Sequence, residues 1–242
     1  MRPWRSTLVD SLLPQLGISL PAGAPMPLDL AALFPRPMRA VWLEVGFGAG
    51  EHLIAQARAH PEVGYIGCEP FMNGVATVLA ELDRQPADNI RLFTDDARLL
   101  IARLPEASLE RVFVLFPDPW PKARHHRRRF ISAVMVEQLG RIIAPGGELR
   151  IATDHMDYAR WTLSHLCGAA AGSSPFQWTA RRPEDWRRPP TDWIATRYQH
   201  KAEAAGASPV FLSFRRRRGA AATRKSLVPA SGQEYIALQA RL

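Results

Sequence analysis

A glycine-rich loop and one acidic residue are the first features of the sequence that could do chemistry. The apolar residues 40–45 run directly into the loop GFGAG at 46–50, which precedes a segment with helical spacing. Glycines at a strand-to-helix turn let the backbone bend sharply and approach a ligand closely. Glu69 ends the next apolar segment, nineteen residues after the loop, where a carboxylate can accept hydrogen bonds from both hydroxyls of a ribose. The pattern predicts a site for a cofactor that contains a nucleoside.

The acidic residues around this loop indicate which cofactor it would take. A dinucleotide would require a third glycine where the chain has Glu51, and Glu44 lies two residues before Gly46. These two carboxylates would repel a pyrophosphate. Asp96 and Asp118 follow the next two predicted strands and would join Glu44 and Glu69 at one edge of the sheet. S-adenosylmethionine suits such a rim because its sulfonium and ammonium groups are cationic. For Asp96 taken alone, a helix N-cap is the structural alternative.

A stiff loop and a basic run follow the fourth predicted strand. Three prolines within residues 117–121 exclude a helix there and hold Asp118 in a rigid position. Residues 120–129 contain five Lys or Arg, two His and no acid, a density suited to phosphate contacts. Cations at the start of a helix oppose its dipole, which disfavours a merely solvated helix end. We therefore expect contacts with nucleic-acid phosphates from Lys122, Arg124, Arg127, Arg128 and Arg129.

Six segments together resemble the tRNA (guanine-N7)-methyltransferase family. They are LEVGFGAG at 43–50, GCEP at 67–70, DDA at 95–97, FPDPWPKARHHRRR at 116–129, ATDH at 152–155 and TRYQHK at 196–201. The resemblance spans about residues 40–215, and its most specific part is FPDPWxKxRHxxRR. It implies a Rossmann-like, seven-stranded methyltransferase fold that uses S-adenosylmethionine. The implied reaction is methylation of N7 of the variable-loop guanine at tRNA position 46.

The resemblance also implies roles for individual residues. The cofactor would be bound by Glu44, Gly46, Gly48, Gly50, Glu69 and Asp96. The active-site acid would be Asp118. The substrate would contact Lys122, Asp154, Thr196, Arg197, Tyr198 and Gln199. The family usually has Glu at the position of Gln199; an amide cannot supply a carboxylate's charge, and Glu203 is the candidate substitute.

The implied chemistry needs alignment more than proton transfer. Guanine N7 carries an in-plane lone pair, so no general base has to remove a proton before methyl transfer. Positive charge then develops on the ring, and Asp118, helped by Asp154, would accept hydrogen bonds from guanine more strongly in the transition state. Tyr198 would stack on a base. Trp120 is either part of the site or a packing residue.

Alternating strands and helices must position these residues. Strands are predicted at 40–45, 64–68, 90–94, 112–116, 149–152 and 209–214, and helices at 50–59, 71–82, 97–104, 127–143 and 157–167. This alternation predicts an α/β fold with a mainly parallel, doubly wound sheet, helices on both faces and ligands at the strands' carboxyl ends. We expect the methyltransferase domain at 39–218, with a loop or insertion at 172–190. Outside it we expect a loosely ordered arm at 1–38, with a short helix near 7–16, and a tail at 219–242.

Composition sets the wider limits. The 242 residues carry a net charge of +8 with 47% hydrophobic residues, which indicates a globular protein with an anionic partner such as nucleic acid. Cys68 and Cys167 are too few for a disulfide framework, and neither they nor His125 and His126 have metal-ligand spacing. We expect no metal, no membrane segment and a cytoplasmic protein. The sequence leaves open whether it is a monomer or a homodimer and which tRNAs it prefers.

Three other functions compete with this interpretation. A methyltransferase that modifies an exocyclic amine would have two adjacent prolines followed by an aromatic residue, whereas Asp118 separates the prolines here. A nicotinamide-dependent oxidoreductase is disfavoured by Glu51. A non-catalytic RNA-binding module would need only the basic run, so it would leave the acidic rim without a function.

Overall fold

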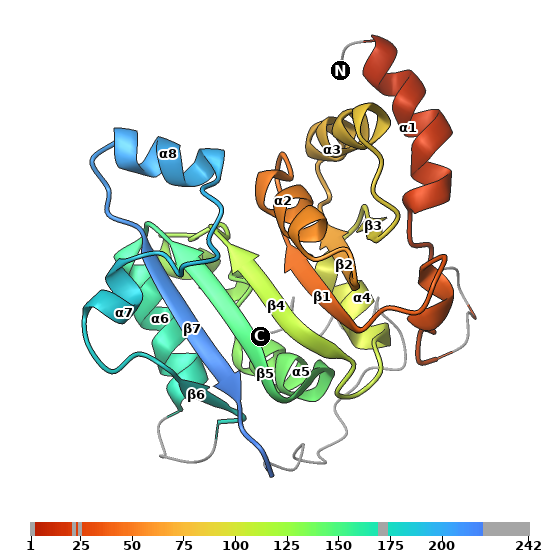
Figure 1. Cartoon of the computed structure of the whole chain (residues 1–242). Helices are drawn as coiled ribbons and strands as arrows, with labels where there is room; N and C mark the ends of the chain where they lie inside the picture. Colours follow the sequence, from red (N-terminus) through yellow and green to blue (C-terminus); the bar gives the residue numbers. More distant parts are fainter. Residues whose placement is uncertain (1–2, 21–22, 24–25, 169–173, 220–242) are drawn as a thin grey trace.

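A mixed β-sheet forms the centre of the molecule (Figure 1). The computed structural model describes residues 3–20, 23, 26–168 and 174–219. Within these residues, seven strands form one sheet in the order β3-β2-β1-β4-β5-β7-β6. The strands are β1 (Ala40–Val45), β2 (Val63–Cys68), β3 (Ile90–Phe93), β4 (Leu109–Leu115), β5 (Ile143–Thr153), β6 (Phe176–Trp178) and β7 (Val210–Arg216). Strands β1 to β5 are parallel, and β7 is antiparallel to β5 and β6, which confirms the predicted doubly wound α/β class.

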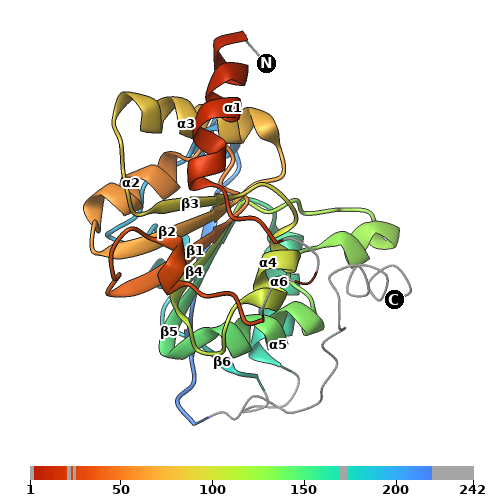
Figure 2. The ribbon, with the colours of Figure 1, turned by 90° about the vertical axis from the view of Figure 1, so that its right-hand side faces the viewer.

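Helices cover both faces of the sheet (Figure 2). They are α1 (Pro3–Leu16), α2 (Glu51–Ala59), α3 (Met72–Arg84), α4 (Ala97–Arg103), α5 (Ala133–Ile142), α6 (Met156–Cys167), α7 (Glu184–Arg187) and α8 (Arg197–Ala204), with short 3-10 helices η1 (Ala31–Leu33) and η2 (Ala123–Arg128). Successive strand residues point to opposite faces, so Leu43 packs with α4, α5 and α6, whereas Trp42 packs with α2 and α3. The two resulting apolar layers bury the sheet almost completely.

The order of the strands determines where a ligand can bind. β1 lies between β2 and β4, and the chain leaves β1 toward one side of the sheet and enters β4 on the other. In a parallel sheet this reversal opens a crevice beyond the carboxyl ends of the strands. The loops after β1, β2, β3 and β4 therefore converge at one place.

Several predicted elements differ from the observed ones. The helix expected at 127–143 is divided, because η2 ends at Arg128 and α5 begins only after Ser132, whose side chain accepts a hydrogen bond from the Met135 amide. The last parallel strand, expected at 149–152, is longer, and the segment 172–190 contains β6 and α7.

The amino-terminal arm is more ordered than expected. α1 begins at Pro3, and Leu8, Leu12 and Leu16 pack against the apolar layer that includes α3. After it, the Ile18 amide donates to the carbonyl of Leu92 in β3 at 2.7 Å. These contacts attach the arm to the sheet edge. Of the predicted tail, residues 220–242 lie outside the described residues.

Candidate active site

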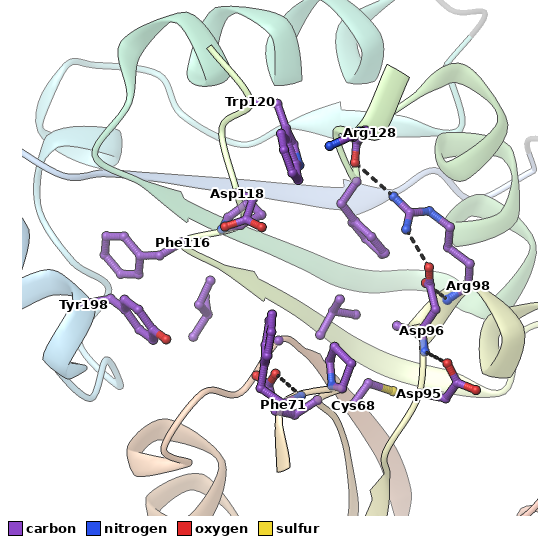
Figure 3. A pocket seen from close by; sticks show the side chains of 18 residues that line it. Cys68, Phe71, Asp95, Asp96, Arg98, Phe116, Asp118, Trp120, Arg128 and Tyr198 are labelled. Atoms are coloured by element: carbon purple, nitrogen blue, oxygen red, sulfur yellow. Dashed lines mark hydrogen bonds and ion pairs between the residues drawn. The ribbon is translucent and has the colours of Figure 1, made fainter. Parts of the chain in front are cut away.

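A cavity of about 390 Å³ opens at the carboxyl ends of β1 to β4 (Figure 3). Its lining consists of Val45, Gly46, Cys68, Glu69, Pro70, Phe71, Asp95, Asp96, Ala97, Arg98, Leu115, Phe116, Pro117, Asp118, Trp120, Arg128, Phe130 and Tyr198. Five of the residues that the sequence analysis assigned to the cofactor, to catalysis or to the substrate therefore meet here: Gly46, Glu69, Asp96, Asp118 and Tyr198. They come from four different loops and from α8.

Glu69 connects the glycine loop to the start of α3. Its side chain is buried, and its two carboxylate oxygens accept the backbone N–H of Gly48 at 2.8 Å and that of Phe71 at 2.9 Å. Each carboxylate oxygen has two acceptor positions, so Glu69 can still accept ligand hydroxyls. The carboxylate is thus fixed in direction before any ligand arrives.

The three glycines of the loop adopt a backbone conformation that other residues rarely adopt. Gly46, Gly48 and Gly50 have φ of 73°, 59° and 82°, in the left-handed region. A Cβ at Gly48 would lie 2.7 Å from Cε2 of Tyr198, and one at Gly50 would lie 2.2 Å from Cγ2 of Val78. A Cβ at Gly46 would meet no atom within 4 Å, because the loop faces open space there.

Asp96 combines a structural position with a place in the cavity. It caps α4, since one oxygen accepts the Arg98 amide at 2.9 Å, and the other pairs with the Arg98 guanidinium at 2.9 Å. Asp95, which the sequence analysis did not select, also lines the cavity and accepts the Asp96 amide at 2.6 Å. The sequence feature that could have identified Asp95 is its position next to Asp96 in the DDA segment. Arg98 and Arg128 are the two cations among the lining residues, which also include the acids Glu69, Asp95, Asp96 and Asp118.

Asp118 lies in a strained and exposed loop. Phe116 and Trp120, on either side of it, have φ of 51° and 41°, and non-glycine residues in this region persist only where surrounding structure enforces them. Among the described residues, no hydrogen bond or ion pair engages the Asp118 carboxylate, which is exposed at the cavity. Trp120 lines the cavity and also packs against its neighbours, since the Arg128 guanidinium lies 4.9 Å from its ring centre.

Aromatic rings surround the mouth of the cavity (Figure 3). Phe71 is 74% exposed and Tyr198 is 41% exposed, unusual fractions for such large apolar side chains. Phe116 and Trp120 line the same cavity. Sequence analysis missed Phe71 and Phe116, although Phe116 immediately follows β4 and Phe71 lies two residues after Glu69. The rings offer flat surfaces to a planar ligand.

Glu44 does not join the acidic rim. It is 2% exposed and lies on the face of β1 that Trp42 also occupies, away from the cavity lining. His52 Nδ1 lies 2.7 Å from its carboxylate, and the Tyr65 hydroxyl donates to it at 3.3 Å. Burial, and then the charge of Glu44, raise the pKa of Tyr65 well above its ordinary value, which keeps this donor protonated. Glu44 is therefore buried among these partners and does not line the cavity.

Most of the predicted substrate residues lie outside the cavity lining. Lys122 and Asp154 are exposed, and Asp154 directly follows β5. Thr196 is buried and caps α8 by accepting the Gln199 amide at 3.3 Å. The guanidinium of Arg197 lies 5.0 Å from the ring centre of Tyr198.

Gln199 is buried and both ends of its amide are engaged. Oε1 accepts the indole N–H of Trp193 at 2.6 Å, and Nε2 donates to the Glu203 carboxylate at 2.8 Å. Trp193 in turn packs against His52 and Phe211, with ring centres 5.5 and 4.8 Å away. The Gln199 amide thus ties α8 to the body of the protein.

The basic run divides into exposed and buried arginines. Arg124, Arg127 and Arg128 are exposed, as phosphate contacts would require. Arg129 is only 1% exposed and forms an ion pair with Asp157 at the start of α6. The expectation that Arg129 contacts phosphate is therefore wrong, because α6 packs over this position.

The described residues form neither a metal-binding cluster nor a membrane-spanning helix. The described residues contain no group of three or more His, Cys, Asp or Glu side chains placed to bind a metal ion. Among the same residues, no helix has both the length and the apolar character that crossing a bilayer requires.

Solved structures similar to this chain agree with the fold. The chain matches the 16S rRNA methyltransferase KamB with a TM-score of 0.52 and 15% identity, covering 75% of this chain and 90% of that one. It matches a variant of the 16S rRNA (adenine(1408)-N(1))-methyltransferase from Catenulisporales acidiphilia with a TM-score of 0.51 and 18% identity, covering 76% and 89%. These likenesses show a class I methyltransferase fold of the Rossmann-like type.

Sequence comparisons identify the family. A family model described as "Putative methyltransferase" matches residues 38–211. The tRNA (guanine-N(7)-)-methyltransferase of Rhodospirillum rubrum is 51% identical over 222 residues, covering 91% of this chain and 86% of the relative. That of Nitrobacter hamburgensis is 47% identical over 221 residues, covering 91% and 84%. With its glycine loop, acidic cavity and FPDPW segment in the places described above, the chain belongs to the tRNA (guanine-N7)-methyltransferase family.

Proposed function

We propose that the protein transfers a methyl group from S-adenosylmethionine to N7 of the guanine at position 46 in the variable loop of tRNA. The observation that carries this proposal is the cavity that brings Glu69, Asp96 and Asp118 together beside the glycine loop and exposed aromatic rings. The names of the curated relatives support the same substrate. An enzyme that modifies tRNA in this way would act in the cytoplasm.

The residues at the inner end of the cavity suit this cofactor. Glu69 would accept hydrogen bonds from the ribose hydroxyls, since its buried carboxylate already has a fixed direction. Asp95 or Asp96 would accept the adenine amino group, and the open space beside Gly46 admits the rest of the molecule. When bound, S-adenosylmethionine supplies an electrophilic methyl group on a sulfonium sulfur. Glu44, held by His52 at the start of α2, would help to fix the end of β1 where the glycine loop begins.

Asp118 would act on the guanine ring. N7 attacks with its in-plane lone pair and the ring gains positive charge, so the N1 and amino protons become stronger hydrogen-bond donors. A fixed carboxylate that accepts these bonds stabilises the transition state more than the ground state. The exposed carboxylate of Asp118, with no partner among the described residues, is available for this role. Asp154, exposed at the neighbouring strand end, would assist.

The remaining residues would bind the RNA. Tyr198 would stack on a base, and Lys122 and Arg197 would contact the backbone nearby as exposed cations. Thr196 and Gln199 would act by shaping α8, because both are buried and engaged within the protein. Their influence on tRNA would be exerted through Tyr198.

One experiment tests the proposed function directly. The protein is incubated with S-adenosylmethionine carrying a labelled methyl group and with unmodified tRNA, and the RNA is digested to nucleosides. We expect the label in 7-methylguanosine, and no label when guanine 46 of the tRNA is replaced by adenine. Label in an N2-methylated guanosine or in a methylated adenosine would contradict the proposal.

A further inference from the structure

We propose that Arg129 is a positioning residue for Asp118: its buried guanidinium fixes the proline-rich loop that holds Asp118 at the cavity. The inference rests on the proposed function, because it concerns the geometry of the methyl-transfer site. It assigns to this arginine of the basic run a role distinct from RNA binding.

The guanidinium contacts the loop immediately after Asp118. Nε of Arg129 donates to the carbonyl of Pro119 at 2.9 Å, and Nη2 lies 3.4 Å from the carbonyl of Trp120. These are the first two carbonyls beyond Asp118 in the chain. A displacement of either peptide would therefore move the Asp118 backbone directly.

The loop needs donors from outside itself. Residues 117, 119 and 121 are prolines, and a proline has no backbone N–H to donate. The loop thus presents carbonyls with few amide hydrogens of its own to pair with them. Its ends also have positive φ at Phe116 and Trp120, a conformation that requires support from surrounding structure. Arg129 supplies part of that support.

Side chains of helix α6 hold the guanidinium of Arg129 in place. The guanidinium forms its ion pair with Asp157, and its centre lies 5.6 Å from the ring centre of Tyr158 and 4.9 Å from that of Trp161. All three partners belong to the first turns of α6. Since the side chain is 1% exposed, a tRNA phosphate cannot reach it. The planar fork of an arginine can meet a carboxylate and two carbonyls at once, which a lysine ammonium does less well.

The primary test compares Arg129→Lys with Arg127→Ala, an exposed neighbour in the same basic run. We expect Arg129→Lys to reduce the single-turnover rate of methyl transfer by roughly tenfold to a hundredfold, the effect of a slightly misplaced catalytic group. Its affinity for S-adenosylmethionine and the salt dependence of tRNA binding should stay unchanged. Arg127→Ala should instead weaken tRNA binding and make the salt slope smaller by about one. A normal rate in Arg129→Lys would overturn the proposal.

A double-mutant cycle tests whether Arg129 acts through Asp118. If it does, adding Arg129→Lys to an Asp118→Asn variant should cause almost no further loss, because the group being positioned is already impaired. Losses that multiply would show that Arg129 acts independently, which would refute the positioning role.

A second variant covers the case in which Arg129→Lys unfolds at the assay temperature. Asp157→Asn leaves Arg129 in place but weakens its anchor, and should give a smaller loss of rate that also disappears in the Asp118→Asn background. No loss, or a loss that persists in that background, would contradict the proposal. Failure of the wild-type protein to methylate tRNA would instead refute the proposed function itself.

Discussion

Gly48 of the glycine loop lies directly against the ring of Tyr198 in α8. A Cβ at position 48 would come within 2.7 Å of the Tyr198 ring, although the two residues are 150 positions apart in the sequence. The loop proposed to bind the cofactor and the helix proposed to meet the substrate are therefore in contact. We therefore expect a substitution in the glycine loop to affect the position of α8, and a substitution in α8 to affect the loop.

Replacing Tyr198 tests the stacking role of this ring. Tyr198→Ala should weaken tRNA binding by about 1–3 kcal/mol, the usual loss when an aromatic platform for a base is removed. Tyr198→Phe keeps the ring and should bind tRNA nearly as the wild type does. Equilibrium binding of unmodified tRNA at fixed salt measures both. Equal affinities of the Ala and Phe variants would exclude stacking at this position.

Replacing Glu69 tests the cofactor site. Glu69→Ala removes both the proposed acceptor for the ribose and the hydrogen bonds to the Gly48 and Phe71 amides. We expect calorimetry to show at least a tenfold loss of affinity for S-adenosylmethionine, or about 1.4 kcal/mol. Glu69→Gln retains an acceptor oxygen but not the charge, so its affinity for S-adenosylmethionine should lie between those of the wild type and Glu69→Ala. Wild-type affinity in Glu69→Ala would remove Glu69 from the site.

Replacing Asp118 separates chemistry from binding. Asp118→Asn has nearly the same shape but cannot stabilise the developing positive charge on guanine. Since loss of one preorganised electrostatic contact typically costs about 10²–10³ in rate, we expect a comparable drop in single-turnover methyl transfer. Binding of S-adenosylmethionine and tRNA should be preserved. An unchanged rate would contradict the role given to Asp118.

The pair Gln199 and Glu203 explains how α8 accommodates an amide where the family usually has a carboxylate. In Gln199→Glu, a second carboxylate would replace the amide that donates to Glu203 at 2.8 Å. Like charges four residues apart destabilise a helix, so the free energy of unfolding should fall by about 0.2–0.5 kcal/mol at pH 7. Adding Glu203→Gln should restore it, as urea denaturation of the single and double variants can measure. A fully stable single variant would show that the two side chains are not coupled.

Asp192 gives the protein a pH-dependent contribution to stability. Burial opposes ionisation of this carboxyl, but the hydrogen bonds and charges of Arg150 and Arg111 outweigh it, so the pKa of Asp192 lies below its ordinary value. A carboxylate with a lowered folded pKa stabilises the fold above its unfolded pKa, and this contribution is lost as the pH falls through the folded value. Asp192→Asn should lower the free energy of unfolding by about 1 kcal/mol at neutral pH, a modest figure because the side chain is partly exposed.

The pH profile distinguishes this effect from simple loss of packing. The difference between wild type and Asp192→Asn should begin to shrink below about pH 4 and should vanish at lower pH. Urea denaturation at a series of pH values measures it. A difference that does not change with pH would mean that the charge of Asp192 contributes nothing.

The sequence by itself determined the alternation of strands and helices over about residues 40–167 and several of the residues that line the cavity. The glycine loop, Glu69 and Asp96 are each placed by local patterns, because an apolar strand followed by a turn puts the next residues at the carboxyl edge of a parallel sheet. Alternating apolar segments also predicted the doubly wound sheet. The proline spacing around Asp118 excluded a helix at 117–121, and the structure has neither a helix nor a strand there.

Only the tertiary structure decided which polar side chains face the ligand. Glu44 and Glu69 both follow apolar runs, yet strand alternation directs Glu44 into the layer of His52 and Tyr65. Arg127 and Arg129 are indistinguishable within a basic run, and the packing of α6 buries only Arg129. Exposure depends on contacts between segments that are distant in the chain, and local composition and spacing carry no information about such contacts.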